Sequence, residues 1–237
     1  MKECISIKTD YSLLSSMIRI SDLFDYAKNN NINTLGIIDN NLSSSIEFLI
    51  SAKKNNIKPV IGLIVKYKDN EIYLYAKNER GLKDLFKLNT YLLDHELDII
   101  ELTKYISNLI IVITTKHLSL FNELNEIGEL FIGYSSEEEK VKALILTDKI
   151  VYFNLALSIT KEDAHYLNYL NMINDNLSYE EYNDKDYSNN YIKCADLSHF
   201  TNLINIELTS NKNLIPHYDN TIEDSYKYLE ILSIKGF

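Results

Sequence analysis

The sequence predicts an α/β fold in which strands and helices alternate to build a small, distorted barrel. Short apolar segments bounded by polar turns recur along the chain, and most are followed by a segment with helical periodicity. This repeating strand–helix order is typical of a largely parallel sheet. Six or seven such units within about 170 residues favour a barrel over a flat, doubly wound sheet.

The N-terminal half carries the clearest pattern. Residues 34–39 are apolar through the middle of the segment, as expected of a strand that is covered on both faces. Ser21 can cap a helix whose apolar face is formed by Leu23, Phe24 and Ala27. We expect strands at 4–9, 34–39, 59–68 and 71–76, with a turn at 69–70, and helices at 21–29, at 43–52 with Ile46, Leu49 and Ile50 facing inward, and at 79–92.

The C-terminal half continues the alternation and becomes less regular towards its end. Residues 174–190 are polar and lack periodicity, which is typical of a long loop. The expected division is a barrel domain over residues 1–210 and a C-terminal segment over residues 211–237. We expect strands at 109–114, 129–134 and 150–154, and helices at 118–127, 137–146, 161–173, 195–208 and 222–234.

Composition and charge narrow the possible classes of function. No apolar run approaches the ~20 residues that a membrane helix needs. The N-terminus turns directly into an alternating segment, so we expect no signal peptide and a cytoplasmic protein. The net charge of -10 argues against this chain as the main nucleic-acid surface, because neutralising phosphates requires clustered Lys and Arg.

Local spacing offers no metal site and no nucleophile. Cys4 and Cys194 fit no zinc or redox spacing, and we expect two reduced thiols with no shared role. None of the five histidines forms a His-x-His or His-x-x-x-His pair. The chain has no Gly-x-Ser-x-Gly elbow and no glycine-rich phosphate loop.

A set of short motifs instead carries the functional information. In order and spacing it resembles the PHP (polymerase and histidinol phosphatase) domain of the bacterial replicative DNA polymerase III alpha subunit. The matching segments are Thr-Asp-Tyr-Ser-Leu-Leu at 9–14, Arg-Ile-Ser-Asp-Leu at 19–23, Ile-Asp-Asn-Asn at 38–41, Ile-Glu-Phe at 46–48, Ile-Lys-Pro-Val-Ile-Gly at 57–62, Tyr-Leu-Tyr-Ala-Lys-Asn at 73–78, Gly-Leu-Lys-Asp-Leu at 81–85, residues 151–173, and Leu-Ile-Pro-His-Tyr at 214–218.

The resemblance implies a distorted TIM-like (β/α)7 barrel of the PHP type. It also implies a parent protein that acts as a DNA-directed DNA polymerase, a nucleotidyltransferase, in chromosomal replication and that uses Mg at a polymerase site outside this chain. The implied partners are the rest of the polymerase alpha subunit, a proofreading exonuclease or other replisome proteins, and DNA through the parent, with no membrane.

Comparison with the metal-binding members of that family indicates a degenerate metal site. Those members hold metals with histidines and carboxylates at the ends of these same segments, whereas most of the corresponding side chains here cannot coordinate a metal. The resemblance places Ser6 and Lys8 at a His-x-His motif, Asp39 and Asn40 in a Thr-Asp-His-Gly motif, Ile64 at a glutamate, and Leu155 and Leu157 in an Asn-Asp-x-His motif, with Asp10 nearby.

Four residues can be interpreted in two ways. Asp39 is either a carboxylate that fixes a loop or helix start or a vestigial metal ligand, and we favour the first. Asp10 is expected to cap the turn before Leu13. We expect surface or structural roles for His117 and His165 rather than catalysis.

Three hypotheses follow. The leading one is a catalytically inactive, metal-free PHP domain that serves as a structural and docking scaffold and needs no cofactor of its own. The alternative is a metal-dependent PHP-type phosphoesterase or 3′–5′ exonuclease with a reduced site that includes Asp10 and Asp39. The third is a free-standing interaction module.

Overall fold

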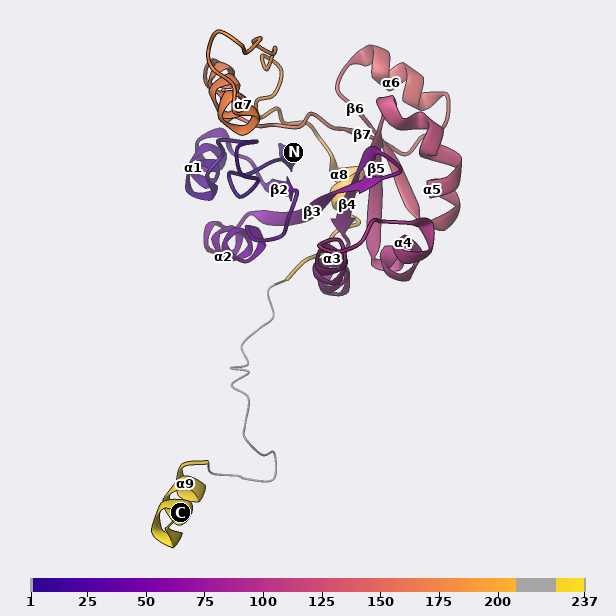
Figure 1. The fold of residues 1–237 in the computed structure, drawn as a ribbon. Coiled ribbons are helices and arrows are strands. Elements are labelled where there is room, and N and C mark those ends of the chain that lie inside the picture. Colours follow the sequence, from indigo (N-terminus) through magenta and orange to yellow (C-terminus); the bar gives the residue numbers. More distant parts are fainter. Residues whose placement is uncertain (1, 208–224, 237) are drawn as a thin grey trace.

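The computed structural model describes residues 2–207 and 225–236, in which one sheet contains all seven strands (Figure 1). The strands lie side by side in their sequence order, and every neighbouring pair is parallel except the two pairs that involve β4. The strands are β1 (Glu3–Ile7), β2 (Thr34–Asp39), β3 (Lys58–Tyr67), β4 (Asn70–Ala76), β5 (Leu109–Thr114), β6 (Glu129–Tyr134) and β7 (Ile150–Tyr152).

The chain that follows β7 joins the two edges of the sheet. The Ala156 N–H donates to the Ser6 carbonyl at 2.8 Å, and the Lys8 N–H donates to the Ala156 carbonyl at 3.0 Å. Ile7 and Ala156 form a parallel bridge between these bonds. The curled sheet is therefore closed into a distorted TIM-like barrel, which confirms the predicted α/β fold class.

The helices α1 to α6 lie around the outside of the sheet (Figure 1). No helix of the described ranges is long and apolar enough to cross a membrane. The helices are α1 (Ile20–Asn30), α2 (Ser45–Asn55), α3 (Glu79–Tyr91), α4 (Ile99–Tyr105), α5 (Phe121–Ile127), α6 (Glu137–Leu144), α7 (Leu167–Asp175), α8 (Ser198–Thr201) and α9 (Ser225–Lys235), with 3-10 turns η1 (Ile106–Asn108), η2 (Thr115–Leu120) and η3 (Glu162–Tyr166).

Two details predicted for the first helices are wrong. Arg19, not Ser21, holds the N-cap position of α1, and Ser21 lies inside the helix and donates to Asp22. In α2 the side chains of Ile46 and Ile50 are 49% and 54% exposed. The buried stripe of α2 follows the helical spacing i, i+3, i+4, i+7 from the first residue of the helix; its members are Ser45, Phe48, Leu49 and Ala52.

The predictions for several later segments also need correction. The helix predicted at 195–208 is limited to the four residues of α8 within the described part. The turn between β3 and β4 is formed by Lys68 and Asp69, both at positive φ, and not by residues 69–70. Helix α4 was not predicted. Residues 208 and 222–224, and the proposed domain boundary at 210, lie outside the described residues.

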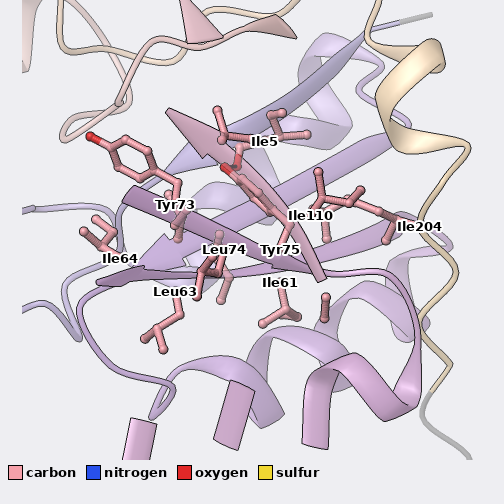
Figure 2. Close-up of a cluster of buried hydrophobic side chains, with 14 of the residues drawn as sticks. Ile5, Ile61, Leu63, Ile64, Tyr73, Leu74, Tyr75, Ile110 and Ile204 are labelled. Atoms are coloured by element: carbon pink, nitrogen blue, oxygen red, sulfur yellow. Dashed lines mark hydrogen bonds between the residues drawn. The ribbon is translucent and has the colours of Figure 1, made fainter. Parts of the chain in front are cut away.

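The segment around α8 covers the end of the barrel at which the parallel strands begin. The Phe200 ring is fully buried and packs edge-on against Tyr75 at 5.4 Å and Phe131 at 5.1 Å. The Tyr75 hydroxyl in turn donates to the Ile5 carbonyl at 2.9 Å inside the barrel. Figure 2 shows Tyr75, Tyr73 and Ile5 within the apolar interior. Because this end is covered, a functional site has to be sought at the opposite end.

The two cysteines meet in this region. The structure joins Cys4 in β1 to Cys194 by a disulfide across a sequence separation of 190 residues. The expectation of two unrelated thiols is therefore wrong. The antiparallel bridge between Glu3 and Ala195 brings the two cysteines together, and no pattern in the local sequence predicts that long-range contact.

Candidate functional site at the carboxyl ends of the strands

The carboxyl ends of the parallel strands meet at one mouth of the barrel, where barrels of this class place their functional groups. Strand β4 is antiparallel to its neighbours, so its first residues lie at this mouth instead. The positions singled out by the sequence lie on three strands and on the segment that closes the barrel: Ser6, Lys8 and Asp10 within or after β1, Asp39 and Asn40 at the end of β2, Ile64 in β3, and Leu155 and Leu157 after β7.

Asp39 is the centre of a saturated hydrogen-bond cluster. Its carboxylate is 1% exposed and accepts four bonds, two on each oxygen. Oδ1 accepts from the Thr9 N–H at 2.7 Å and the Ser12 hydroxyl at 2.8 Å. Oδ2 accepts from the Thr9 and Ser44 hydroxyls, both at 2.7 Å. The carboxylate therefore ties the loop after β1 to the start of α2 and has little remaining capacity to bind a metal ion.

Ser6 and Lys8 replace potential ligands with groups that serve the barrel itself. The Ser6 hydroxyl donates to the Asn154 carbonyl at 2.7 Å, across the seam where the sheet closes. The Lys8 side chain is only 8% exposed. Burial lowers the pKa of its ammonium, while the negative charges of Glu71 and Asp39 act in the opposite direction. A largely buried ammonium at this mouth opposes the binding of a divalent cation.

The remaining aligned positions do not converge on one cavity. Asn40 and Ile64 line a cavity of 330 Å³ beside the β3–β4 hairpin. Leu155 lines a different cavity, of 440 Å³, at the mouth. The Leu157 carbonyl accepts from the Ser16 hydroxyl at 3.1 Å, so this residue holds a loop through its backbone. Apolar side chains at three of these four positions cannot supply metal ligands.

Asp10 does not cap the turn that the sequence assigned to it. Thr9 does so instead, because its hydroxyl accepts from the Tyr11 N–H at 3.3 Å and its carbonyl accepts from the Ser12 N–H at 3.0 Å. The Asp10 Oδ1 atom is buried and has no hydrogen-bond partner. Burial raises the pKa of the Asp10 carboxyl, and the Arg19 guanidinium partly offsets this effect.

Sequence reasoning missed several groups that line the 440 Å³ cavity. Glu71 and Tyr73 reach it from β4, and Asn190 reaches it from the polar segment that follows α7. Burial, reinforced by Glu71, raises the pKa of the Tyr73 hydroxyl. His117 lies in the same lining with its Nδ1 2.7 Å from the Asn70 Oδ1. The alternation of Glu71, Tyr73 and Tyr75 places them on one face of β4, but which end of that face lies at the mouth depends on the strand's direction.

The donor set does not fit a catalytic metal cluster. Across residues 2–207 and 225–236, no three His, Cys, Asp or Glu side chains are grouped so that they could hold a metal ion. His165 is exposed, and its Nδ1 lies 2.7 Å from the Glu162 carbonyl, away from this set. The groups at the mouth fasten loops, close the sheet and neutralise one another's charge.

Known proteins match this chain over most of its length. DNA polymerase III subunit alpha of Staphylococcus aureus strain COL is 26% identical over 247 residues, which cover 94% of this chain and 23% of that protein. The corresponding protein of Streptococcus pyogenes is 27% identical over 206 residues, covering 83% of this chain and 19% of the relative. The chain thus spans about a fifth to a quarter of the length of these relatives.

A family model matches most of the barrel. The family model described as "PHP domain" matches residues 5–145, which contain the last three residues of β1, all of β2 to β6 and the Asp39 cluster. The match covers more than half of the 237 residues. The chain belongs to the PHP domain family.

Proposed function

We propose that this chain is the PHP domain of a replicative DNA polymerase III alpha subunit that works in the cytoplasm. The parent protein would carry out template-directed DNA synthesis with Mg at a polymerase site outside this chain. The support is the similarity to two such subunits over 83% to 94% of the chain. The domain itself would act as a structural and docking scaffold for the polymerase body and for a proofreading exonuclease or other replisome protein.

The observation that carries the inactive-scaffold proposal is the use of Asp39. A carboxylate that accepts four short hydrogen bonds from Thr9, Ser12 and Ser44 is committed to the fold. Lys8 adds a buried positive charge at the same mouth. Metal-dependent hydrolysis needs ligands that converge and leave a position open for water, and this set of side chains does not fit that requirement.

The size of the native protein tests the proposed parent. An antibody raised against this chain should detect, in source cells, a band several times larger than the 27.5 kDa of the chain. The captured native protein should extend a primed template in a reaction that requires Mg. A band at 27.5 kDa without primer extension would contradict the polymerase assignment and favour a free-standing interaction module.

One observation favours the alternative of a metal-dependent phosphoesterase with a reduced site. The buried Asp10 Oδ1 lacks a partner, and such an atom could serve as a ligand. On that alternative, the purified chain would release phosphate or a terminal nucleotide in the presence of a divalent metal, and Asp10→Asn would abolish the reaction without loss of stability. On the scaffold proposal, neither protein hydrolyses these substrates.

A further inference from the structure

The disulfide joins the first strand of the barrel to the segment that covers the end at which the parallel strands begin. Cys4 is 3% exposed within β1, whereas Cys194 is only partly buried. Their Cα atoms are 4.9 Å apart, which is within the range that disulfides require.

Other contacts hold the same two segments together without the sulfurs. Glu3 and Ala195 exchange two backbone hydrogen bonds, at 3.0 and 3.1 Å. The buried Glu3 carboxylate accepts from the Leu197 N–H at 2.7 Å and from the Thr201 hydroxyl at 2.8 Å. These bonds do not involve the sulfurs, so they would hold the two thiols in register for closure after reduction.

We propose that Cys4 and Cys194 form a reversible redox tether that fastens residues 194–207 to β1. Its reaction partner is a low-molecular-weight disulfide such as oxidised glutathione. Disulfides in proteins of reducing compartments are characteristically transient and redox-sensing. The pairing of the two cysteines follows from their own positions and from the contacts around Glu3, whereas its reversibility rests on the cytoplasmic setting of the proposed function.

Exposure sets the order of the two exchange steps. The Cys194 thiolate, which is the more accessible, attacks the small disulfide, forms a mixed disulfide and releases one small thiolate. The buried Cys4 thiolate then attacks the Cys194 sulfur and releases the second small thiolate. Two protein thiols are oxidised, one small disulfide is reduced to two thiols, and the protons of the protein thiols end on the small thiols.

The tether controls how firmly residues 194–207 are held against the barrel. This segment includes Phe200, whose ring packs inside the barrel at the end where the parallel strands begin. It also includes Thr201, whose carbonyl accepts from the Lys58 ammonium at 2.8 Å. Reduction leaves these contacts in place, so it loosens the segment rather than unfolding the barrel. Oxidation ties the start of this segment covalently to β1.

Equilibration of the folded 237-residue chain with glutathione buffers of different ratios tests the chemistry. After acid quenching and alkylation, peptide mass spectrometry should show a reversible link between Cys4 and Cys194. Cys4→Ser should accumulate glutathione on Cys194, whereas Cys194→Ser should leave Cys4 unmodified while folded. Failure of the wild-type link at every ratio would overturn the proposal, as would equal glutathione labelling of both single variants.

Hydrogen exchange tests the structural consequence. Amides of residues 194–207 should exchange about tenfold more slowly in the linked form, because local opening is restricted, while those of β5 should not change. The double variant with Cys4→Ala and Cys194→Ala should exchange like the reduced form at every glutathione ratio. Equal exchange of the linked and reduced wild-type chains in this segment would refute the tether.

Discussion

Replacing Asp39 by alanine should destabilise the barrel, because the substitution removes the acceptor of four buried hydrogen bonds. The hydroxyls of Thr9, Ser12 and Ser44 can rotate towards other acceptors, but the Thr9 N–H is fixed by the backbone. An orphaned buried donor costs about 1–3 kcal/mol, and each lost bond to a charged group about 1.5–3 kcal/mol. Recovered desolvation of the carboxylate offsets part of this loss. We expect a net loss of about 2–4 kcal/mol.

Urea unfolding followed by circular dichroism measures this loss. Asp39→Asn is the isosteric comparison: its single oxygen can keep two of the four bonds, so it should lose about half as much stability as Asp39→Ala. Asp25→Ala removes an exposed carboxylate from α1 and should change stability by less than about 0.5 kcal/mol. Equal urea midpoints for Asp39→Ala and Asp25→Ala, with an unchanged m-value, would show that the bonds to Asp39 do not stabilise the barrel.

Three further results are expected. Burial raises the pKa of the Asp10 carboxyl, so the stability that its protonated form contributes is present below about pH 4 and is lost as the pH rises through the folded pKa. In thermal melts between about pH 3.5 and about pH 7, Asp10→Asn should remove this decline. The variant should also melt at a higher temperature than the wild type at neutral pH. Gly81→Ala places a Cβ 2.2 Å from the Asn108 carbonyl oxygen and should cost about 1–3 kcal/mol in urea unfolding; an unchanged midpoint would contradict the close approach of α3 to η1. Glu3→Gln should cost about 1–3 kcal/mol and speed amide exchange around Thr201, whereas unaltered exchange there would show that the carboxylate does not hold the segment.

The sequence predicts the strands with continuous apolar runs and sharp polar ends. The bounds of β2, β5 and β6 agree with the prediction because each apolar run ends where its strand leaves the sheet. The inward face of α2 was misassigned because Ile46, Leu49 and Ile50 also fit a helical stripe. Packing against α1, where the Phe48 ring meets Phe24 at 5.4 Å, selects the other stripe.

At the site, the sequence predicts which residues lie at strand ends, but it does not predict the contacts that those residues make in the folded barrel. The resemblance placed Lys8 and Asp39 at strand ends, and the structure places both at the mouth of the barrel. The saturation of Asp39 was not predictable, because its donors come from two loops whose approach depends on the closed sheet. Glu71 was missed for a related reason: its position at the mouth depends on the antiparallel direction of β4.

Calorimetric titration of the purified chain with Mn²⁺ or Zn²⁺ shows whether this barrel mouth can hold a catalytic metal. We expect no saturable binding of either ion, and no phosphoesterase activity on a nucleotide ester when either metal is added. Saturable binding of at least one ion per chain, together with hydrolysis that disappears when the ion is chelated, would contradict this expectation.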